Sequence, residues 1–108
     1  MHVVGTKHLK DAAARFPDAA KPIAAWRAIA RESHWRTFDD VRQVFADAES
    51  AGEYVVFRIH QDRYRLVTTI HYPPATDGKL GEGHIWIRSL LTQKQFENTA
   101  RWDEGDLR

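Results

Sequence analysis

The sequence contains no cysteine, so disulfide bonds, thiolate metal ligands and a cysteine nucleophile are all excluded. It has no apolar run of the roughly 18 residues that a membrane span needs, and no apolar stretch of the kind found in signal peptides. We therefore expect a cytoplasmic protein without membrane contact. The histidines form no His-x-His or His-Glu-x-x-His arrangement, and Gly78, Gly81 and Gly83 precede a predicted strand rather than a helix. These patterns predict no metal site, no cofactor and no glycine-rich phosphate loop.

The residues that are present are typical of one globular domain. A chain of 108 residues with 43% hydrophobic and 29% charged residues can bury one core but not two, so we expect a single domain over residues 1–108. Its net charge of +1 is unevenly distributed, because residues 54–96 carry six Lys or Arg against three Asp or Glu. This basic segment also holds three histidines and favours an anionic partner, although so small a surplus is also found on ordinary solvated surfaces.

The first half of the chain has helical periodicity. Apolar residues recur there at i, i+3, i+4 and i+7 in three segments. The predicted helices cover residues 6–16, 19–32 and 38–50. Asp18 and Thr37 immediately precede two of them and are candidate N-caps. Two further helical turns are predicted over residues 92–102.

After residue 53 the periodicity becomes that of β-strands. Strands are predicted over residues 54–60, 64–72 and 84–91, and residues 1–4 are a candidate short opening strand. A polar stretch can form a hairpin turn between the first two strands of this half, and a loop rich in Pro and Gly precedes the last. Helices followed by an antiparallel meander predict an α+β domain, with N-terminal helices packed on one face of a small antiparallel sheet and a short C-terminal helix.

Alternation along the strands assigns each side chain to one face of the sheet. The helix-facing set predicted to be buried consists of Trp26, Phe45, Phe57, Leu66, Ile70 and Ile87, with Ile85 beside them. The opposite face is then left open to solvent. It is predicted to carry Arg65, His71, His84, Trp86 and Arg88.

The order and spacing of several short strings resemble the HigB branch of the RelE and ParE toxin superfamily. The matching pieces are Phe16-Pro17-Asp18-Ala19, Trp26, residues 35–45, Val56-Phe57-Arg58-Ile59, Tyr64-Arg65-Leu66, Ile70-His71-Tyr72 and Ile87-Arg88-Ser89-Leu90-Leu91-Thr92, and the similarity extends over about residues 7–98. The resemblance implies a RelE-like fold and the toxin of a type II toxin-antitoxin system. It further implies an mRNA interferase, that is, a ribosome-dependent endoribonuclease that cleaves mRNA and inhibits translation.

The same resemblance implies partners and site residues. The partners would be the ribosome, mRNA and a cognate HigA-like helix-turn-helix antitoxin. The toxin would be linked to operator DNA only indirectly, through this antitoxin. The arginine of the tyrosine-arginine-leucine strand is a functional candidate in this family, which implies Arg65, and the arginine of the last strand is Arg88. Where many relatives have a histidine and then a tyrosine after that strand, this chain has Gln93 and Phe96.

Metal-free RNA cleavage requires a deprotonated 2′-hydroxyl, a stabilised phosphate charge and a protonated leaving oxygen. The candidate catalytic residues are Arg65 and Arg88, whose planar forks can hold phosphate oxygens, His71 for proton transfer, and Lys94 for either task. The candidate RNA-binding residues are Arg58, Arg63, His84 and Trp86, the last by stacking on a base. Each has a structural alternative, because strand arginines are usually solvated and tryptophans are usually packed.

Two other functions remain open at this point. A non-catalytic module could bind RNA or the ribosome and block translation by occupancy, leaving stalled but intact message. A ParE-like poison of gyrase, which ranks third, would produce DNA cleavage complexes rather than RNA fragments.

Overall fold

Helices fill the first half of the chain and strands most of the second, as the sequence predicts. The computed structural model describes residues 1–73 and 83–98. Its elements are β1 (His2–Val4), α1 (Thr6–Arg15), the 3-10 turn η1 (Pro17–Ala19), α2 (Ala20–Glu32), α3 (Phe38–Val44), β2 (Glu49–Ala51), β3 (Tyr54–Ile59), β4 (Tyr64–His71), β5 (His84–Thr92) and α4 (Gln93–Asn98). Within the described ranges, no helix has the length and apolar character needed to cross a membrane.

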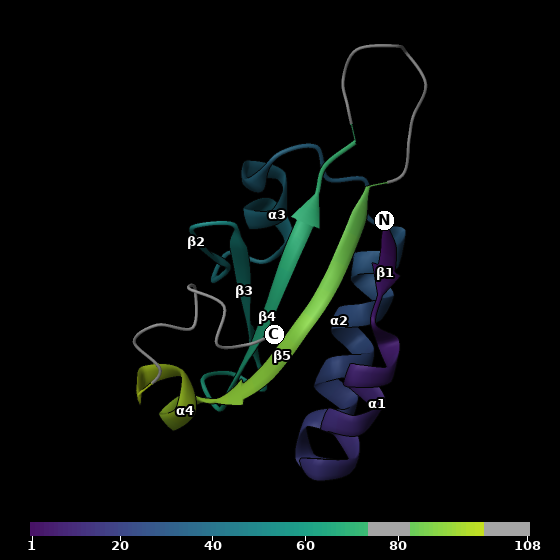
Figure 1. The fold of residues 1–108 in the computed structure, drawn as a ribbon. Coiled ribbons are helices and arrows are strands. Elements are labelled where there is room, and N and C mark those ends of the chain that lie inside the picture. Colours follow the sequence, from purple (N-terminus) through teal and green to yellow (C-terminus); the bar gives the residue numbers. More distant parts are fainter. Residues whose placement is uncertain (74–82, 99–108) are drawn as a thin grey trace.

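The five strands form one mixed sheet in the order β1-β5-β4-β3-β2 (Figure 1). The antiparallel meander of β3, β4 and β5 is confirmed, and each strand ends within one residue of its predicted end. The α+β class is confirmed, and the sheet as a whole is mixed rather than antiparallel throughout, because the opening strand β1, whose pairing was not predicted, pairs with β5 in parallel. Such a pair needs a long crossover, and here the whole chain from α1 to β4 separates the two strands.

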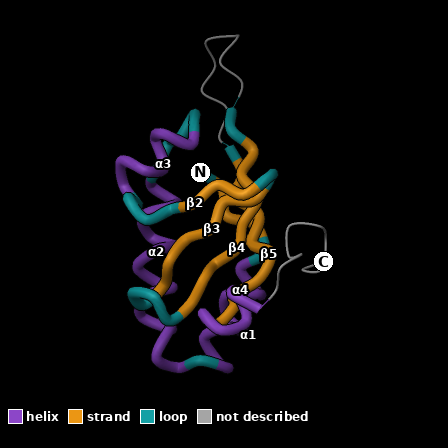
Figure 2. The backbone as a smooth tube through the Cα atoms, turned by 90° about the vertical axis from the view of Figure 1, so that its left-hand side faces the viewer, coloured by secondary structure: helices purple, strands orange, loops and turns teal. Residues whose placement is uncertain are grey.

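Helices α1, α2 and α3 cover one face of the sheet and bury the main core there (Figure 2). Of the predicted core, Trp26, Phe57, Leu66, Ile70 and Ile87 are buried, whereas Phe45 is half-buried against their cluster. The ring of Trp26 meets that of Phe57 edge-on at 5.2 Å between centroids, a favourable aromatic geometry. The helix-facing side of the strands is therefore the side that the alternation predicted.

Two of the predicted helices differ from the observed ones at their ends. Thr37 does cap α3, since its Oγ1 accepts from the Asp40 backbone nitrogen at 3.3 Å. However, α3 ends at Val44 rather than at residue 50, and residues 49–51 instead form the edge strand β2. Asp18 makes no side-chain cap for α2. The predicted C-terminal turns are described only as far as residue 98, and most of the predicted 73–83 loop likewise lies outside the described residues.

Candidate functional site

The face of the sheet that points away from α1, α2 and α3 carries most of the candidate residues, and we call it the outer face. Strand register places its side chains in rows across neighbouring strands, because directly paired residues point to the same side. The outer face consists of Tyr54, Val56 and Arg58 on β3, Arg65, Val67, Thr69 and His71 on β4, and His84, Trp86, Arg88, Ser89 and Leu91 on β5. The sequence-predicted grouping of two arginines, two histidines and a tryptophan on one face therefore exists.

Half of the outer face is nevertheless covered. Tyr54, Val56, Val67 and Leu91 form a second buried apolar cluster, against which Phe96 of α4 packs. Helix α4 follows directly on β5 (Figure 1), and the cluster extends from Leu91 near the end of β5 across β4 to Tyr54 at the start of β3. The expectation of a fully open face is wrong for this part of the sheet.

Arg65 lies under that layer and is only 6% exposed. Its Nη1 donates to the carbonyl oxygens of Asp62 at 2.9 Å and Tyr64 at 3.3 Å, and its guanidinium lies 5.5 Å from the centre of the Phe96 ring. The buried Nε has no hydrogen-bond partner. The prediction that Arg65 is an exposed side chain is therefore wrong, because α4 places an aromatic ring where solvent was expected.

Arg88, in contrast, is exposed and fixed in position. Val67 pairs with Ser89 and Thr68 with Ile87, so Arg88 is the extra residue of a β-bulge in β5. Its Nε donates to Thr69 Oγ1 at 2.9 Å, which orients the guanidinium while leaving its two terminal nitrogens without an ion-pair partner among the described residues. A bulge that aims a side chain in this way is common beside functional sites.

A pocket of about 180 Å³ adjoins Arg88 where α1 meets β5. Arg88 lines it together with three polar residues of α1, namely His8, Asp11 and Arg15. Sequence reasoning missed these three because their spacing of three and four residues is also that of an ordinary solvated helix face. They bring an imidazole, a carboxylate and a second guanidinium to the same pocket as Arg88.

The exposed end of the outer face carries histidines and a tryptophan. His71 and His84 are paired across β4 and β5, and His2 of β1 is paired with His84 on its other side. The ring of His2 lies 5.6 Å from that of His84, and the ring of His71 lies 6.4 Å from that of Trp86. The side chains of the three histidines and of Trp86 are exposed. We call His2, His84 and His71 the histidine row. Trp86 is 38% exposed rather than packed under a loop.

Arg58 and Arg63 are both engaged in ion pairs. Arg58 contacts Glu49 at 3.4 Å and Asp62 at 2.6 Å, and hydrogen bonds to these two carboxylates raise the pKa of its guanidinium. Arg63 pairs with Asp18 of η1 at 2.9 Å, so its side chain points toward the helical layer and not along the outer face. Of the four candidate RNA-binding residues, Arg63 therefore lies apart from the outer face.

Helix α4 contains Gln93 and Phe96, the two positions at which this chain differs from many of the proteins that it resembles. Thr92 and Gln95 form a reciprocal capping box, in which Gln95 N donates to Thr92 Oγ1 at 3.1 Å and Thr92 N to Gln95 Oε1 at 3.0 Å. The Gln93 amide donates to Glu97 at 3.2 Å, whereas Lys94 is exposed. Gln93 and Phe96 thus have structural partners on α4 or beneath it.

No group of three or more His, Asp or Glu side chains suited to a metal ion occurs in residues 1–73 and 83–98. What the described site offers is an exposed oriented arginine, imidazoles and an indole on a small α+β scaffold. A mixed sheet covered by helices on one side is the α+β arrangement of a RelE-like fold.

The sequence matches the HigB_toxin family, the RelE-like toxic component of a toxin-antitoxin system, over residues 19–99. The chain belongs to this family, because the match covers most of its length. The matched range contains all of α2, α3 and the meander, and therefore Arg65, Arg88 and the α4 positions. No curated protein sequence matches the chain.

Proposed function

We propose that this toxin is a metal-independent endoribonuclease that cuts mRNA on translating ribosomes in the cytoplasm and thereby stops protein synthesis. The observation that carries the proposal is Arg88, an exposed guanidinium oriented by Thr69 and free of carboxylate partners in the described part of the chain. Such a group can hold two oxygens of the scissile phosphate and stabilise the charge that builds on it in the transition state.

Proton transfer needs a second type of group. His71 is exposed on the same face as Arg88, and an imidazole can gain or lose a proton near neutral pH. Lys94 is exposed on α4, just beyond the end of β5 that pairs with Tyr64, so it lies at the opposite end of β4 from His71 and is assigned to the charge of a neighbouring phosphate. In this scheme His71 removes the proton of the 2′-hydroxyl, whose oxygen attacks phosphorus while the bond to the 5′-oxygen breaks. The released 5′-oxygen takes a proton from water.

The RNA would lie over the exposed end of the outer face. Trp86 has a ring available for stacking on a splayed base, and His84, two residues earlier on β5, is paired with His2 of β1. Arg58 and Arg63 have carboxylate partners that an RNA phosphate would have to replace, so we assign them a smaller share of binding than Arg88. Arg65 we place behind the site, where it supports α4 through Phe96.

A translating extract with labelled message tests the proposal. The wild-type toxin should produce defined cuts within codons, and Arg88→Ala should lower their rate by on the order of 100-fold or more. Arg88→Lys should restore only part of the activity, because it keeps the charge but loses the fork. Arg42→Ala, which removes an exposed arginine of α3 on the opposite side of the sheet, is the matched control and should cut normally.

A second candidate is a translation inhibitor that binds without cutting. It is favoured by the burial of Arg65 and by the amide and phenyl groups at Gln93 and Phe96, which cannot carry protons. Its outcome in the same extract is stalled ribosomes on intact message. That result would overturn the nuclease proposal and leave the RNA-binding face in place.

A further inference from the structure

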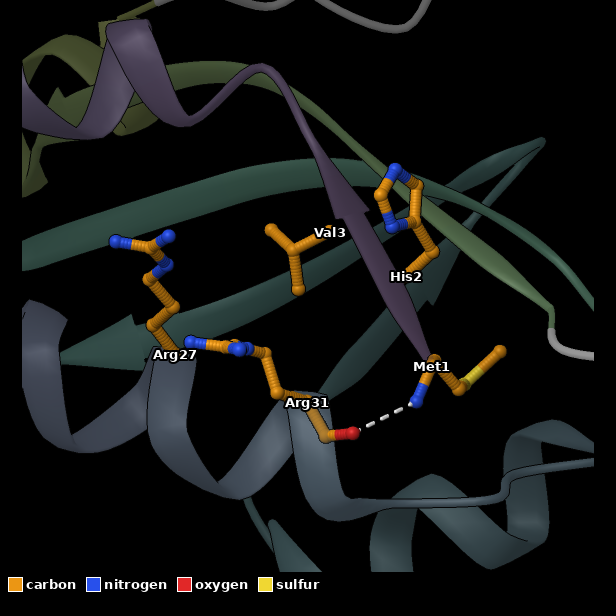
Figure 3. Close-up of a pocket in the computed structure, with 5 residues that line it drawn as sticks. All are labelled: Met1, His2, Val3, Arg27 and Arg31. Atoms are coloured by element: carbon orange, nitrogen blue, oxygen red, sulfur yellow. Dashed lines mark hydrogen bonds between the residues drawn. The ribbon is translucent and has the colours of Figure 1, made fainter.

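A pocket of about 310 Å³ lies between the edge strand β1 and the C-terminal half of α2. Met1, His2 and Val3 line it on the strand side, and Arg27 and Arg31 line it on the helix side (Figure 3). The ammonium group of Met1 donates to the carbonyl oxygens of Ala30, Arg31 and Ser33, which fixes β1 against the end of α2. The walls of the pocket are therefore held in place by backbone contacts.

The two arginines form an uncompensated pair of cations. They are four residues apart on α2 and thus lie on one face of the helix, where like charges repel each other. Among the described residues neither guanidinium takes part in a salt bridge or donates a side-chain hydrogen bond. The Nε of Arg27 is buried and has no acceptor. A buried charged donor without an acceptor is costly, and an anion in the pocket would supply one.

The pocket and the proposed RNA-binding face lie on the two sides of β1 and share one residue, His2, whose ring points away from the two arginines (Figure 3). His2 lines the pocket and is also the first member of the histidine row, whose rings reach His84 and then His71 beside Trp86. Because β1 is the edge strand of the sheet, a chain that runs off the outer face over His2 reaches the helix side of the sheet here. An extended polyanion lying over Trp86 and the histidine row would arrive at Arg27 and Arg31.

We propose that this pocket binds a backbone phosphate of single-stranded RNA, one or more nucleotides away from the stretch held by Trp86 and Arg88. The inference rests on the proposed function in that it takes RNA as the ligand of the outer face. It adds a second anchoring site on α2 and β1, outside the residues that perform the chemistry. The two arginines suit a phosphate better than lysines would, since each can donate two parallel hydrogen bonds.

Salt titration of RNA binding by the purified toxin, without ribosomes, tests this site. The probe is a labelled single-stranded oligouridylate, and the quantity is the slope of log K against log salt concentration. Arg31→Gln should weaken binding and reduce the slope by about 0.7, the contribution of one phosphate contact on a single strand. When salt is raised from about 50 to 200 mM, both proteins lose affinity for the oligouridylate, and the factor lost by Arg31→Gln should be about 2.6 times smaller than the factor lost by the wild type.

Lys21→Gln is the matched control, because it removes an exposed cation from the same helix outside the pocket. It should leave the slope unchanged. An equal slope in the wild type and Arg31→Gln would overturn the inference. So would an Arg31→Gln variant that binds RNA normally but binds the antitoxin more weakly, because the pocket would then be a contact for a protein. This assay needs no cleavage, so a toxin that shows the Arg31-dependent slope but cuts no message would refute the nuclease proposal alone.

Discussion

At the scale of single residues, Asp18 shows how a side chain can serve a different purpose from the one its position suggests. It precedes α2 and was a candidate cap, yet its carboxylate accepts from Tyr64 Oη at 2.7 Å and from Arg63 at 2.9 Å. These bonds join η1 to the start of β4, which is 46 residues away in sequence. The sequence predicts local partners well, but it contains no signal for a partner at that separation.

The Asp18 network makes stability depend on pH. The hydrogen bond from Tyr64, followed by that from Arg63, lowers the pKa of Asp18, and the same carboxylate raises the pKa of Tyr64. A lowered folded-state pKa means that the unfolded chain binds the proton first, so this stabilisation is present above the ordinary Asp value of about 3.9 and is lost as pH falls through the lower folded value.

We therefore expect the urea midpoint of the wild type to fall between about pH 5 and pH 3 by more than that of Asp18→Asn. Tyr64→Phe removes the largest cause of the shift and should show an intermediate loss. Both variants keep the apolar parts of the side chains concerned. Identical losses in all three proteins would assign the acid sensitivity to other carboxylates.

Arg65 gives a second prediction at this scale. Because it is buried and donates to two backbone carbonyls, Arg65→Ala should leave those acceptors unpaired and cost about 2 kcal/mol of unfolding free energy. Arg58→Ala is the control, since Arg58 is directly opposite on β3 but has only exposed ion pairs, which contribute little. Urea unfolding of both variants measures the difference. Equal unfolding free energies of the two variants would mean that the hydrogen bonds of Arg65 do not stabilise the fold. A growth-arrest assay of Arg65→Ala can be interpreted only after the folded fraction of that variant has been measured.

At the scale of elements, the sequence predicted the types of element better than their pairing. Period-2 alternation identified β3, β4 and the first part of β5 because each has one face on the core. It could not reveal the bulge at Arg88, after which Leu90 faces the core opposite Leu66, and Leu91 joins the outer face opposite Arg65. Strict alternation would have exchanged the two leucines, since one extra residue reverses every side chain that follows.

The edges of the sheet were the hardest elements to predict. Strand β2 has three residues, too few for a periodic signal, and Ala48 continued the helical spacing of α3, which is why the predicted helix was too long. The direction of β1 depends on which strand it reaches after folding, and apolar residues in a short run do not encode that choice. The burial of Arg65 was missed for a related reason, because it depends on where α4 docks.

The docking of α4 can be tested through its cap. A helix of six residues is not stable by itself, so α4 depends on the Thr92 and Gln95 capping box and on the packing of Phe96. Thr92→Ala should cost about 1 kcal/mol and expose Arg65. Urea unfolding measures the first effect, and faster modification of Arg65 by an arginine-specific dicarbonyl reagent measures the second.

Thr37→Ala is the control for this experiment, because it removes the corresponding cap from α3 on the other side of the sheet. It should lower stability without changing the reactivity of Arg65. If both variants leave Arg65 equally unreactive, Phe96 is held by contacts other than the cap, and α4 is not what controls access to this arginine.

At the scale of the whole molecule, the two sides of the sheet have different tasks. The helical layer supplies the main core, whereas the outer face carries the smaller cluster of Tyr54, Val56, Val67 and Leu91 and leaves Arg88, His71, His84 and Trp86 exposed. The pocket on α2 and β1 extends this cationic surface around the sheet edge. If this surface binds RNA as proposed, the antitoxin must keep the two apart, and we propose a HigA-like helix-turn-helix protein for that role.

The salt dependence of the complex distinguishes the ways in which the antitoxin could act. If it covers the outer face, part of its affinity comes from charge, and the complex should weaken as salt rises from about 0.1 M, where the Debye length is about 10 Å, toward 1 M, where it is about 3 Å. Calorimetric titration of the wild type and of a double variant, Arg88→Gln with Lys94→Gln, measures this. The double variant should bind more weakly at low salt and show a flatter salt dependence. If salt weakens antitoxin binding equally in the wild type and the double variant, the antitoxin binds elsewhere and blocks ribosome entry by its bulk. If salt changes the affinity of neither protein for the antitoxin, apolar contacts hold the complex together.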